Sequence, residues 1–338
     1  MKEIEIAGGG LAGLSLGIAL RKRGVPVVIR EAGNYPRHRV CGEFINGVTL
    51  DTLENLGIAG IFTDALRHRF TRWWMGERRI LEAPLRHPAL GMSRWVMDER
   101  LREEFERAGG SLRVRDRVKP VAREGLVWAA GRQLEKASEL LGLKAHFEGV
   151  DLGGCLEMHV GDGGYVGLTP VTGNRSRINV CGLFRKAGGG GGGNPLLRAL
   201  ESCGLGGLAA RLGEACLDPK SLTGISGIAL GRQVSDGELL TLGDSERMIP
   251  PFTGNGMSMA FESAECAVAA LVDYAAGRRT WHEARREVAD LLEKRFASRV
   301  RLALVLHRCL VGSAGRAVLS SAAVSGVLPF QWLHRKLS

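Results

Sequence analysis

The feature that most constrains this chain lies at its start, where residues 4–31 read IEIAGGGLAGLSLGIALRKRGVPVVIRE. Gly8, Gly10 and Gly13 supply the pattern G-x-G-x-x-G directly after Ile4–Ala7, an apolar segment typical of a short strand. In that position the first glycine permits a tight turn, the second lets the backbone approach a pyrophosphate, and the third lets a helix pack closely on a strand. The segment therefore predicts a phosphate-binding turn that opens a helix.

The residues after the turn complete a strand–helix–strand unit. A helical pattern starts at Leu11 and Ala12, and Val25–Arg30 is typical of a second strand that ends at Glu31. Glu31 lies 18 residues after Gly13, where a carboxylate can accept hydrogen bonds from the hydroxyls of a ribose. The unit predicts an adenine dinucleotide site and leaves the choice between NAD and FAD open.

Length and composition set the broad class of the protein. The chain has 338 residues, of which 45% are hydrophobic and 24% charged, so it can bury a sizeable core, and two intertwined subdomains are expected. It contains no run of about 18 uncharged apolar residues and begins without a signal-peptide pattern, so a cytoplasmic protein with no spanning helix is expected. The seven cysteines form no C-x-x-C pair, and neither a disulfide framework nor a metal site is expected.

Positive charge is concentrated near the C-terminus. The net charge is +10, and residues 278–338 hold twelve Lys or Arg but only four Asp or Glu. Such clustering is typical of proteins that bind nucleic acid, an anionic membrane or an acidic partner. Because no nucleic-acid-binding motif accompanies it, nucleic acid is not favoured. The first interpretation is a solvated helix face, with peripheral membrane or partner contact as the alternative.

A second constellation lies far downstream, in residues 239–266. A predicted strand at 239–242 ends in Gly-Asp, and Asp244 is placed to accept a hydrogen bond from a ribityl or sugar hydroxyl. A proline turn follows, and then a helix is expected to begin, with unpaired N–H groups that suit the anionic edge of a reduced flavin. The candidate cofactor contacts in this turn and helix start are Pro251, Gly254, Asn255, Gly256 and Met257.

Together these motifs resemble the FAD-dependent oxidoreductases of the aromatic hydroxylase and geranylgeranyl reductase superfamily, over roughly residues 1–275. Residues 35–44, YPRHRVCGEF, are similar to the Pro-Arg-x-Lys-x-Cys-Gly-Glu loop of the reductase-like branch. Residues 93–98, SRWVMD, are similar to a segment whose arginine contacts the cofactor region. The resemblance implies further cofactor contacts at Arg39, Cys41, Gly42 and Arg94.

The resemblance also implies the fold class, which is α/β. We expect a Rossmann-like FAD-binding domain of the glutathione-reductase type, an inserted antiparallel β-sheet substrate domain and a helical C-terminus. The expected ranges are 1–65, 91–135 and 236–276 for the FAD-binding domain, 66–90 and 136–235 for the sheet domain, and 277–338 for the basic helical region. Helices are expected at 48–57, 93–108, 135–143 and from about 255 to 276, and the six glycines at 188–193 are expected to form a loop or linker.

One departure from the family pattern affects the electron donor. The middle motif, normally Ala-Asp-Gly-Arg, reads VWAAGRQ here, so Ala130 stands where the family has an Asp. Gly131 and Arg132 follow, and Arg132 remains placed to serve the pyrophosphate. Both free NAD(P)H and a flavin reductase partner stay open as the source of electrons.

The favoured function is that of an FAD-dependent monooxygenase (EC 1.14 over EC 1.3) that acts through a flavin C4a-hydroperoxide. Its substrate would be a hydrophobic aromatic or polyketide-like small molecule of secondary metabolism. No side chain is singled out as an acid, base or nucleophile, because the flavin carries the redox chemistry. The candidate pocket residues are Trp73, Trp74, Met75, Tyr165 and Phe184.

Three alternatives remain. A carbon–carbon double-bond reductase of an isoprenoid is favoured by the Cys-Gly-Glu loop. A flavin-dependent halogenase is disfavoured, since the chain has no W-x-W-x-I-P segment. The alternative from another class is an FAD-binding protein with degenerate activity and a basic membrane- or partner-binding tail, which Ala130 favours.

Overall fold

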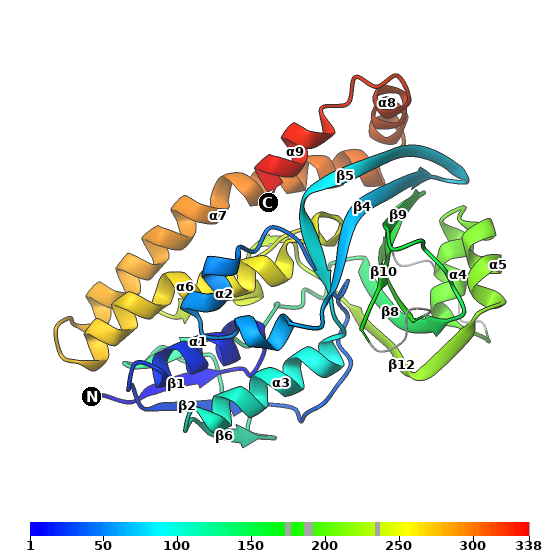
Figure 1. Ribbon diagram of the computed structural model, residues 1–338. Coiled ribbons are helices and arrows are strands. Elements are labelled where there is room, and N and C mark those ends of the chain that lie inside the picture. The colour runs from blue at the N-terminus through cyan, green and yellow to red at the C-terminus, as the bar shows by residue number, and fades with distance from the viewer. Residues whose placement is uncertain (173–176, 186–191, 234–236, 338) are drawn as a thin grey trace.

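The first layer of the molecule is a parallel five-stranded sheet at the N-terminal end (Figure 1). The computed structural model describes residues 1–172, 177–185, 192–233 and 237–337. The order is β14-β7-β1-β2-β6, and the bounds are β1 Ile4–Ala7, β2 Val27–Glu31, β6 Ser111–Val114, β7 Leu126–Trp128 and β14 Leu240–Thr241. Because the strands are parallel, the segments that follow β1, β2, β7 and β14 meet at one edge of the sheet.

Three helices cover this sheet: α1 (Leu11–Arg21), α3 (Arg94–Arg107) and α6 (Gly256–Ala275). Every residue of α1 from Leu11 to Leu20 is buried, since the helix packs against both other helices as well as the sheet. A methyl group on Gly17 would lie 2.8 Å from Phe105 of α3 and 2.9 Å from Ile29 of β2, so the glycine allows this close packing.

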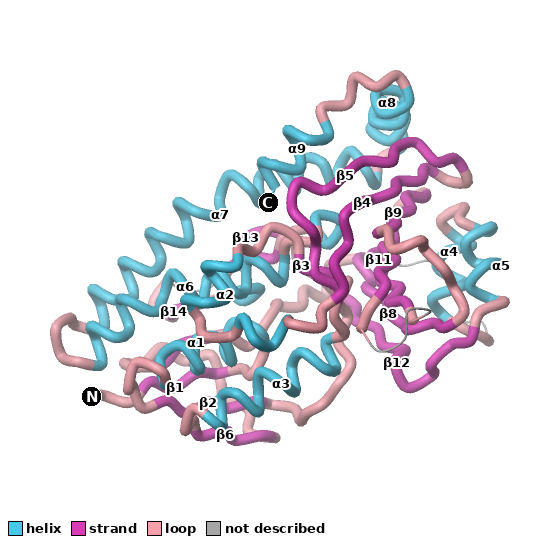
Figure 2. Tube along the Cα trace, in the orientation of Figure 1, coloured by secondary structure: helices cyan, strands magenta, loops and turns pink. Residues whose placement is uncertain are grey.

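The second layer is an eight-stranded sheet with the order β12-β8-β11-β10-β9-β4-β5-β3 (Figure 2). Its pairs are antiparallel except β4 with β9, which are parallel. The strands are β3 Phe44–Ile45, β4 Leu66–Met75, β5 Arg78–Gly91, β8 Leu140–Glu148, β9 Leu156–Gly161, β10 Gly164–Pro170, β11 Ile178–Arg185 and β12 Cys216–Ser226.

The two faces of this sheet belong to different cores. Tyr165 and Leu183 lie in the main hydrophobic core, whereas the next residues, Val166 and Phe184, lie in a second core. Alternation of side chains along each strand causes this division. The second core is closed by α4 (Pro195–Ser202) and α5 (Gly206–Gly213).

The C-terminal segment is helical. The 31-residue helix α7 (Trp281–Val311) packs along α6, and α8 (Ser313–Val324) and α9 (Phe330–Leu337) turn back onto β5 (Figure 1). In the described part of the chain, no single helix is long and apolar enough to cross a bilayer; α7 and α8 meet that test only as a pair bent by 99°. The remaining short elements are α2 Leu50–Asn55, η1 Ala59–Phe62, β13 Gly231–Arg232, η2 Gly243–Ser245, β15 Arg247–Met248 and η3 Pro251–Thr253.

The predicted fold class is confirmed, with two local differences. The helix expected at 135–143 is wrong: residues 140–148 form β8, which pairs with β11 on one side and β12 on the other. Pairing on both sides overrides the helical pattern of its leucines. Residues 44–45, expected in a loop within the range 1–65 of the cofactor domain, form β3 and pair with β5 of the second sheet. Most of the glycine run 188–193 lies outside the described residues.

Candidate functional site

The three glycines of the first motif have different surroundings. Gly8 has a φ of +108°, and a Cβ there would lie 2.3 Å from the Ala129 carbonyl oxygen. A Cβ on Gly13 would lie 2.0 Å from the Gly8 carbonyl oxygen, so this glycine lets α1 approach β1. A Cβ on Gly10 would meet nothing within 4 Å. The turn is thus packed from behind at Gly8 and Gly13 and is open at Gly10, where a pyrophosphate would approach.

Glu31 at the end of β2 is held against this turn. Its oxygens accept hydrogen bonds from the backbone N–H of Gly9 (2.9 Å) and of Gly33 (2.7 Å), and Arg37 forms an ion pair with it at 2.7 Å. Burial alone would raise the pKa of Glu31, but the charges of Arg39 and Arg37 and the two N–H groups lower it below its ordinary value. The group is therefore an ionised acceptor at neutral pH, suited to a ribose diol.

The loop of residues 35–44, which contains Cys41 and is called the cysteine-containing loop below, forms one charged cluster with the start of α3. Asp98, fully buried, accepts from Arg94 (2.6 Å) and from Arg39 (2.9 Å). Burial alone would lower the pKa of Arg94, but Asp98 and the nearby Cys41 side chain raise it above its ordinary value. One nitrogen of Arg39, Nη2, is buried and lacks a hydrogen-bond partner among the described residues, although it lies 3.8 Å from Glu31. This cluster has positive charge left for an anionic ligand.

The downstream motif reaches the same edge of the sheet. Gly243, with a φ of +59°, packs between Ala12 of α1 and Ala260 of α6, and its N–H donates to Ser263 (3.0 Å). Burial raises the pKa of the adjacent Asp244 carboxyl, and the positive charges of Arg132 and Arg94 partly offset this effect. Asp244 therefore lies beside residues from the middle and upstream motifs.

The middle motif is part of this edge as well. The Gly131 carbonyl accepts from the Ser245 hydroxyl at 2.8 Å, and Arg132 Nη2 donates to the Val40 carbonyl at 3.0 Å. Ala130 is exposed. Gly131 and Arg132 together thus join the downstream turn to the cysteine-containing loop.

The start of α6 packs against the loop that follows Cys41 and Gly42. Gly254 has a φ of +68°, and a Cβ there would lie 2.0 Å from the Phe44 ring. Its carbonyl accepts from the Asn46 N–H at 3.3 Å, and the Asn46 carbonyl in turn accepts from Ser258. Asn255 caps α6 without a side-chain hydrogen bond to the helix, and Gly256 and Met257 form its first turn, after Pro251 of η3.

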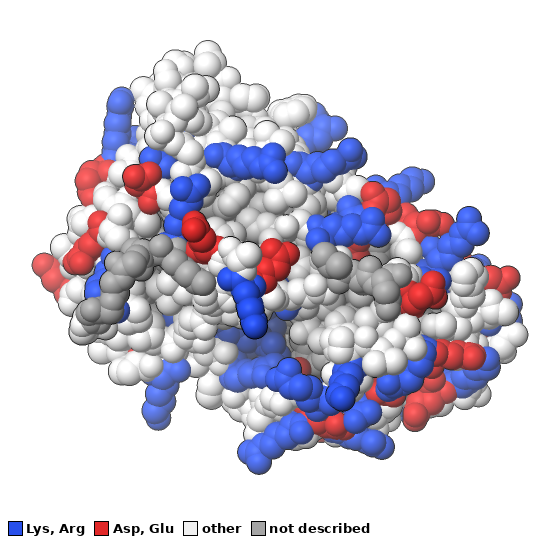
Figure 3. Space-filling model, turned by 180° about the vertical axis from the view of Figure 1, so that it is seen from behind, with Lys and Arg blue, Asp and Glu red and all other residues white. Residues whose placement is uncertain are grey.

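These residues fit an FAD molecule. The turn is open at Gly10, Nη2 of Arg39 is buried without a hydrogen-bond partner among the described residues, and Asp244 lies in positive surroundings. The start of α6 adds backbone N–H groups that no helical bond uses. Figure 3 shows Lys and Arg side chains bordering a hollow on the rear face, as an anionic dinucleotide requires.

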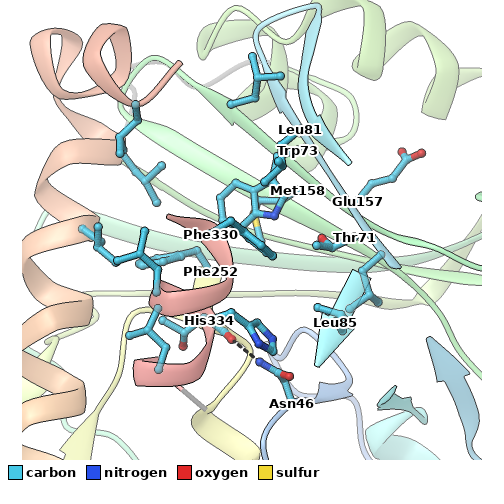
Figure 4. A pocket seen from close by; sticks show the side chains of 18 of the residues that line it. Asn46, Thr71, Trp73, Leu81, Leu85, Glu157, Met158, Phe252, Phe330 and His334 are labelled. Carbon is cyan, nitrogen blue, oxygen red and sulfur yellow. Dashed lines mark hydrogen bonds between the residues drawn. The ribbon is translucent and has the colours of Figure 1, made fainter. Parts of the chain in front are cut away.

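An apolar cavity of about 120 Å³ lies beyond the start of α6. Phe252 and Thr253, directly before the Gly254–Asn255 turn, line it together with Trp73 of β4 and Phe330 of α9 (Figure 4). The other lining residues come mainly from β4, β5, β9 and the C-terminal helices, and most are apolar: Phe44, Met75, Ile80, Leu81, Leu85, Leu156, Met158, Leu168, Leu306, Leu310, Leu319, Leu328, Leu333 and Leu337. The cavity therefore adjoins the turn at Gly254–Asn255, which is called the cofactor-facing turn below.

The predicted pocket aromatics divide between this cavity and other places. Trp73 lines the cavity, and Tyr165 packs edge-on against Phe252 at 5.8 Å between ring centroids without lining it. Trp74 stacks on His159, and Phe184 lies in the second core, so neither lines this cavity. Trp74 directly follows Trp73, and Phe184 directly follows Leu183. Because successive side chains of a strand point to opposite faces of the sheet, Trp74 and Phe184 lie on the face away from this cavity.

A buried charged cluster lies behind the cysteine-containing loop. Glu43 is fully buried, accepts from His146 Nε2 at 2.6 Å and lies 3.4 Å from the ammonium of the equally buried Lys144. The Glu43 carboxylate also accepts a hydrogen bond from the backbone N–H of Arg94 at 3.0 Å. Lys144 also contacts His38 at 3.0 Å. These bonds join the loop, the start of α3 and strand β8.

Several site residues were not predicted from the sequence. Asp98 orients both arginines, Tyr35 donates to the Gly9 carbonyl, and Phe252 and the stripe of α9 line the cavity. The i, i+3, i+7 spacing of Phe330, Leu333 and Leu337 was the available signal for α9. No sequence pattern signalled Tyr35, because its partner lies 26 residues away.

Comparisons with known proteins agree with this geometry. The profile of the family described as FAD binding domain matches residues 1–151. YetM of Bacillus subtilis (strain 168), whose name describes it as a candidate FAD-dependent monooxygenase, is 39% identical over 74 residues. That stretch is 22% of this chain and spans 19% of the relative's length.

Solved structures share the fold across nearly the whole chain. The p-nitrophenol 4-monooxygenase PnpA of Pseudomonas putida DLL-E4 has a TM-score of 0.77 at 14% identity, covering 100% of this chain and 99% of that one. PqsL of P. aeruginosa, in complex with 2-aminobenzoylacetate, has a TM-score of 0.73 at 16% identity, covering 96% and 99%. The flavin-dependent brominase Bmp2 has a TM-score of 0.75 at 17% identity, covering 99% and 93%.

Proposed function

We propose that this chain is an FAD-dependent monooxygenase, since the profile of the FAD-binding domain family matches its residues 1–151 and it shares its fold with monooxygenases and a flavin-dependent brominase. The observation that carries the proposal is the position of the apolar cavity. Phe252 and Thr253 line that cavity and directly precede the turn at Gly254–Met257 that would hold the flavin ring.

Each part of the chain has a distinct task in this proposal. FAD, when bound, supplies oxygen-activating redox chemistry. The Gly8–Gly13 turn and Glu31 bind the adenosine half, while Arg39, Arg132 and Asp244 hold the pyrophosphate and ribityl region. The apolar cavity excludes water and holds a hydrophobic aromatic or polyketide-like substrate beside the ring. Electrons come from NAD(P)H, either directly or through a reductase partner.

Oxygen dependence tests the proposal. Purified FAD-loaded protein is mixed with NADPH and an apolar phenol, with and without oxygen, and NADPH oxidation and substrate mass are followed. A monooxygenase consumes oxygen and adds 16 Da to the substrate. A parallel assay replaces the phenol with an isoprenoid; oxygen-independent saturation of its double bond would instead favour the reductase function that the Cys-Gly-Glu loop suggests.

A further inference from the structure

The C-terminal helix α9 forms one wall of the apolar cavity. Phe330, Leu333, His334 and Leu337 line the cavity, and their i, i+3, i+4, i+7 spacing places them on one face of the helix. The opposite face is exposed and carries Gln331, Trp332, Arg335 and Lys336. The helix is therefore amphipathic, and its apolar face is directed into the candidate substrate site (Figure 4).

Three aromatic rings from distant parts of the chain meet in this cavity. The Trp73 ring lies 6.4 Å from Phe252 and 6.5 Å from Phe330 between centroids, with interplanar angles of 74° and 72°. These edge-to-face contacts join the second sheet, the cofactor-facing turn and α9 around one space. An aromatic lining of this kind suits a flat, apolar ring.

The cavity offers no charged partner to a ligand. Among the described lining residues, the one carboxylate is that of Glu157, which is paired with His159 at 3.2 Å and Arg211 at 3.0 Å and points away from the aromatic rings in Figure 4. Burial and the nearby charges of His87 and Arg86 lower the pKa of His334, which favours the neutral form of that ring. The lining therefore favours an uncharged ligand.

The end of α9 is attached to the cofactor side of the molecule. Asn255, the fully buried residue that precedes α6, donates from Nδ2 to the Leu337 carbonyl. A further polar contact of this wall runs from Gln331 Nε2 to the Pro84 carbonyl at 2.8 Å. An eight-residue helix is too short to be stable alone in water, so α9 depends on these contacts and on its apolar face.

We propose that α9 is the specificity-determining wall of the substrate pocket: Phe330 selects a flat, uncharged apolar ring, and the Asn255–Leu337 contact holds the wall against the cofactor helix. The inference rests on the proposed function in one respect, namely that the apolar cavity is the substrate site.

Binding of a model ring tests the role of Phe330. The probes are 2-naphthol and its charged counterpart 2-naphthoate, titrated by calorimetry at pH 7 into FAD-loaded wild-type, Phe330→Ala and Trp332→Ala proteins. We expect Phe330→Ala to weaken 2-naphthol binding about tenfold. Trp332→Ala, on the exposed face of the same helix, should change it less than about twofold, and 2-naphthoate should bind the wild type at least about tenfold more weakly than 2-naphthol.

The outcomes separate this inference from the proposed function. Absence of 2-naphthol binding, equal losses in the two variants, or equal affinity for naphthol and naphthoate would overturn it. Thermal unfolding and FAD affinity, measured for each variant, show whether the fold and the cofactor site are intact. Selective 2-naphthol binding without oxygen-dependent turnover would leave this inference standing and reject the monooxygenase.

Proteolysis of the FAD-free protein tests the contact with Asn255. Arg335 and Lys336 are exposed trypsin sites within α9. Cleavage there, followed by mass spectrometry, should be several-fold faster in Asn255→Ala than in the wild type, and 2-naphthol should slow it in the wild type. Equal cleavage rates in the two proteins would show that the contact does not hold the wall.

Discussion

Gly10 and Gly13 belong to one motif but should respond differently to the same substitution. Gly10→Ala adds a methyl group to open space at an extended backbone position, so the fold should be unaffected while FAD affinity falls about tenfold or more. Gly13→Ala places the methyl group against the Gly8 carbonyl and should cost about 1–3 kcal/mol of stability. Chemical denaturation and FAD titration of both variants check this; equal stability losses would contradict it.

Asp244 illustrates a conflict between stability and binding. The pKa of this carboxyl group is higher in the folded than in the unfolded protein. Its ionisation therefore reduces the free energy of unfolding once the pH rises above the ordinary pKa near 3.8. Asp244→Asn should therefore unfold at a higher temperature than the wild type at pH 7 in FAD-free form. The same change should weaken FAD binding about tenfold to a hundredfold, because a charge-assisted hydrogen bond is worth about 1.5–3 kcal/mol. A variant that loses stability and retains full affinity would reject this role.

The buried carboxylate of Glu43 should make the folded protein less stable in acid. Burial alone would raise its pKa, but the hydrogen bond from His146 and the charge of Lys144 lower it below its ordinary value. The stabilisation is therefore present above about pH 4.5 and is lost as the pH falls through the depressed pKa. The difference in unfolding free energy between wild type and Glu43→Gln should shrink as the pH falls from 6 towards 3. Glu103→Gln, at an exposed site, is the control and should show no such trend.

At the scale of single elements, local sequence patterns were sufficient to predict a helix or strand where one face of that element packs against one neighbour. The first strand, the start of α1 and the ends of α3 and α6 follow from glycine spacing and apolar periodicity, and they lie within two residues of the prediction. Strand β8 could not be predicted from its own sequence. Its pairing with β11 and β12 makes it a strand rather than a helix, and a single segment does not contain that information. Likewise, Trp73 and Trp74 are equivalent in sequence but lie on opposite faces of β4.

The helix α7 has a start signal whose energetic contribution can be measured. Thr280 and Glu283 form a capping box, in which each side chain accepts from the other residue's backbone N–H. Thr280→Ala should cost about 1 kcal/mol and lower the melting temperature by about 2 °C. Thr280→Ser should retain most of the stability; if both variants behave alike, the cap does not stabilise the protein.

At the scale of the whole molecule, the site is assembled from the two ends of the chain. The proposed cofactor side combines residues 8–42 with residues 244–257, both of which contain motifs that the sequence analysis singled out. The wall formed by α9 was not predictable in the same way, since its position depends on how α7 packs. Part of the basic excess of the C-terminal segment has a structural use: Arg295 and Arg299 pair with the buried Glu262 of α6, at 2.8 and 3.2 Å.

The central claim, that one FAD molecule binds between the Gly8–Gly13 turn and the start of α6, is tested most directly by a fluorescence titration of FAD-free protein with FAD. We predict saturable binding of one FAD per chain, with affinity reduced about tenfold or more in Gly10→Ala and in Asp244→Asn, which change the upstream and the downstream motif respectively. Failure of the folded wild-type protein to bind FAD, or equal affinities in all three proteins, would contradict the account.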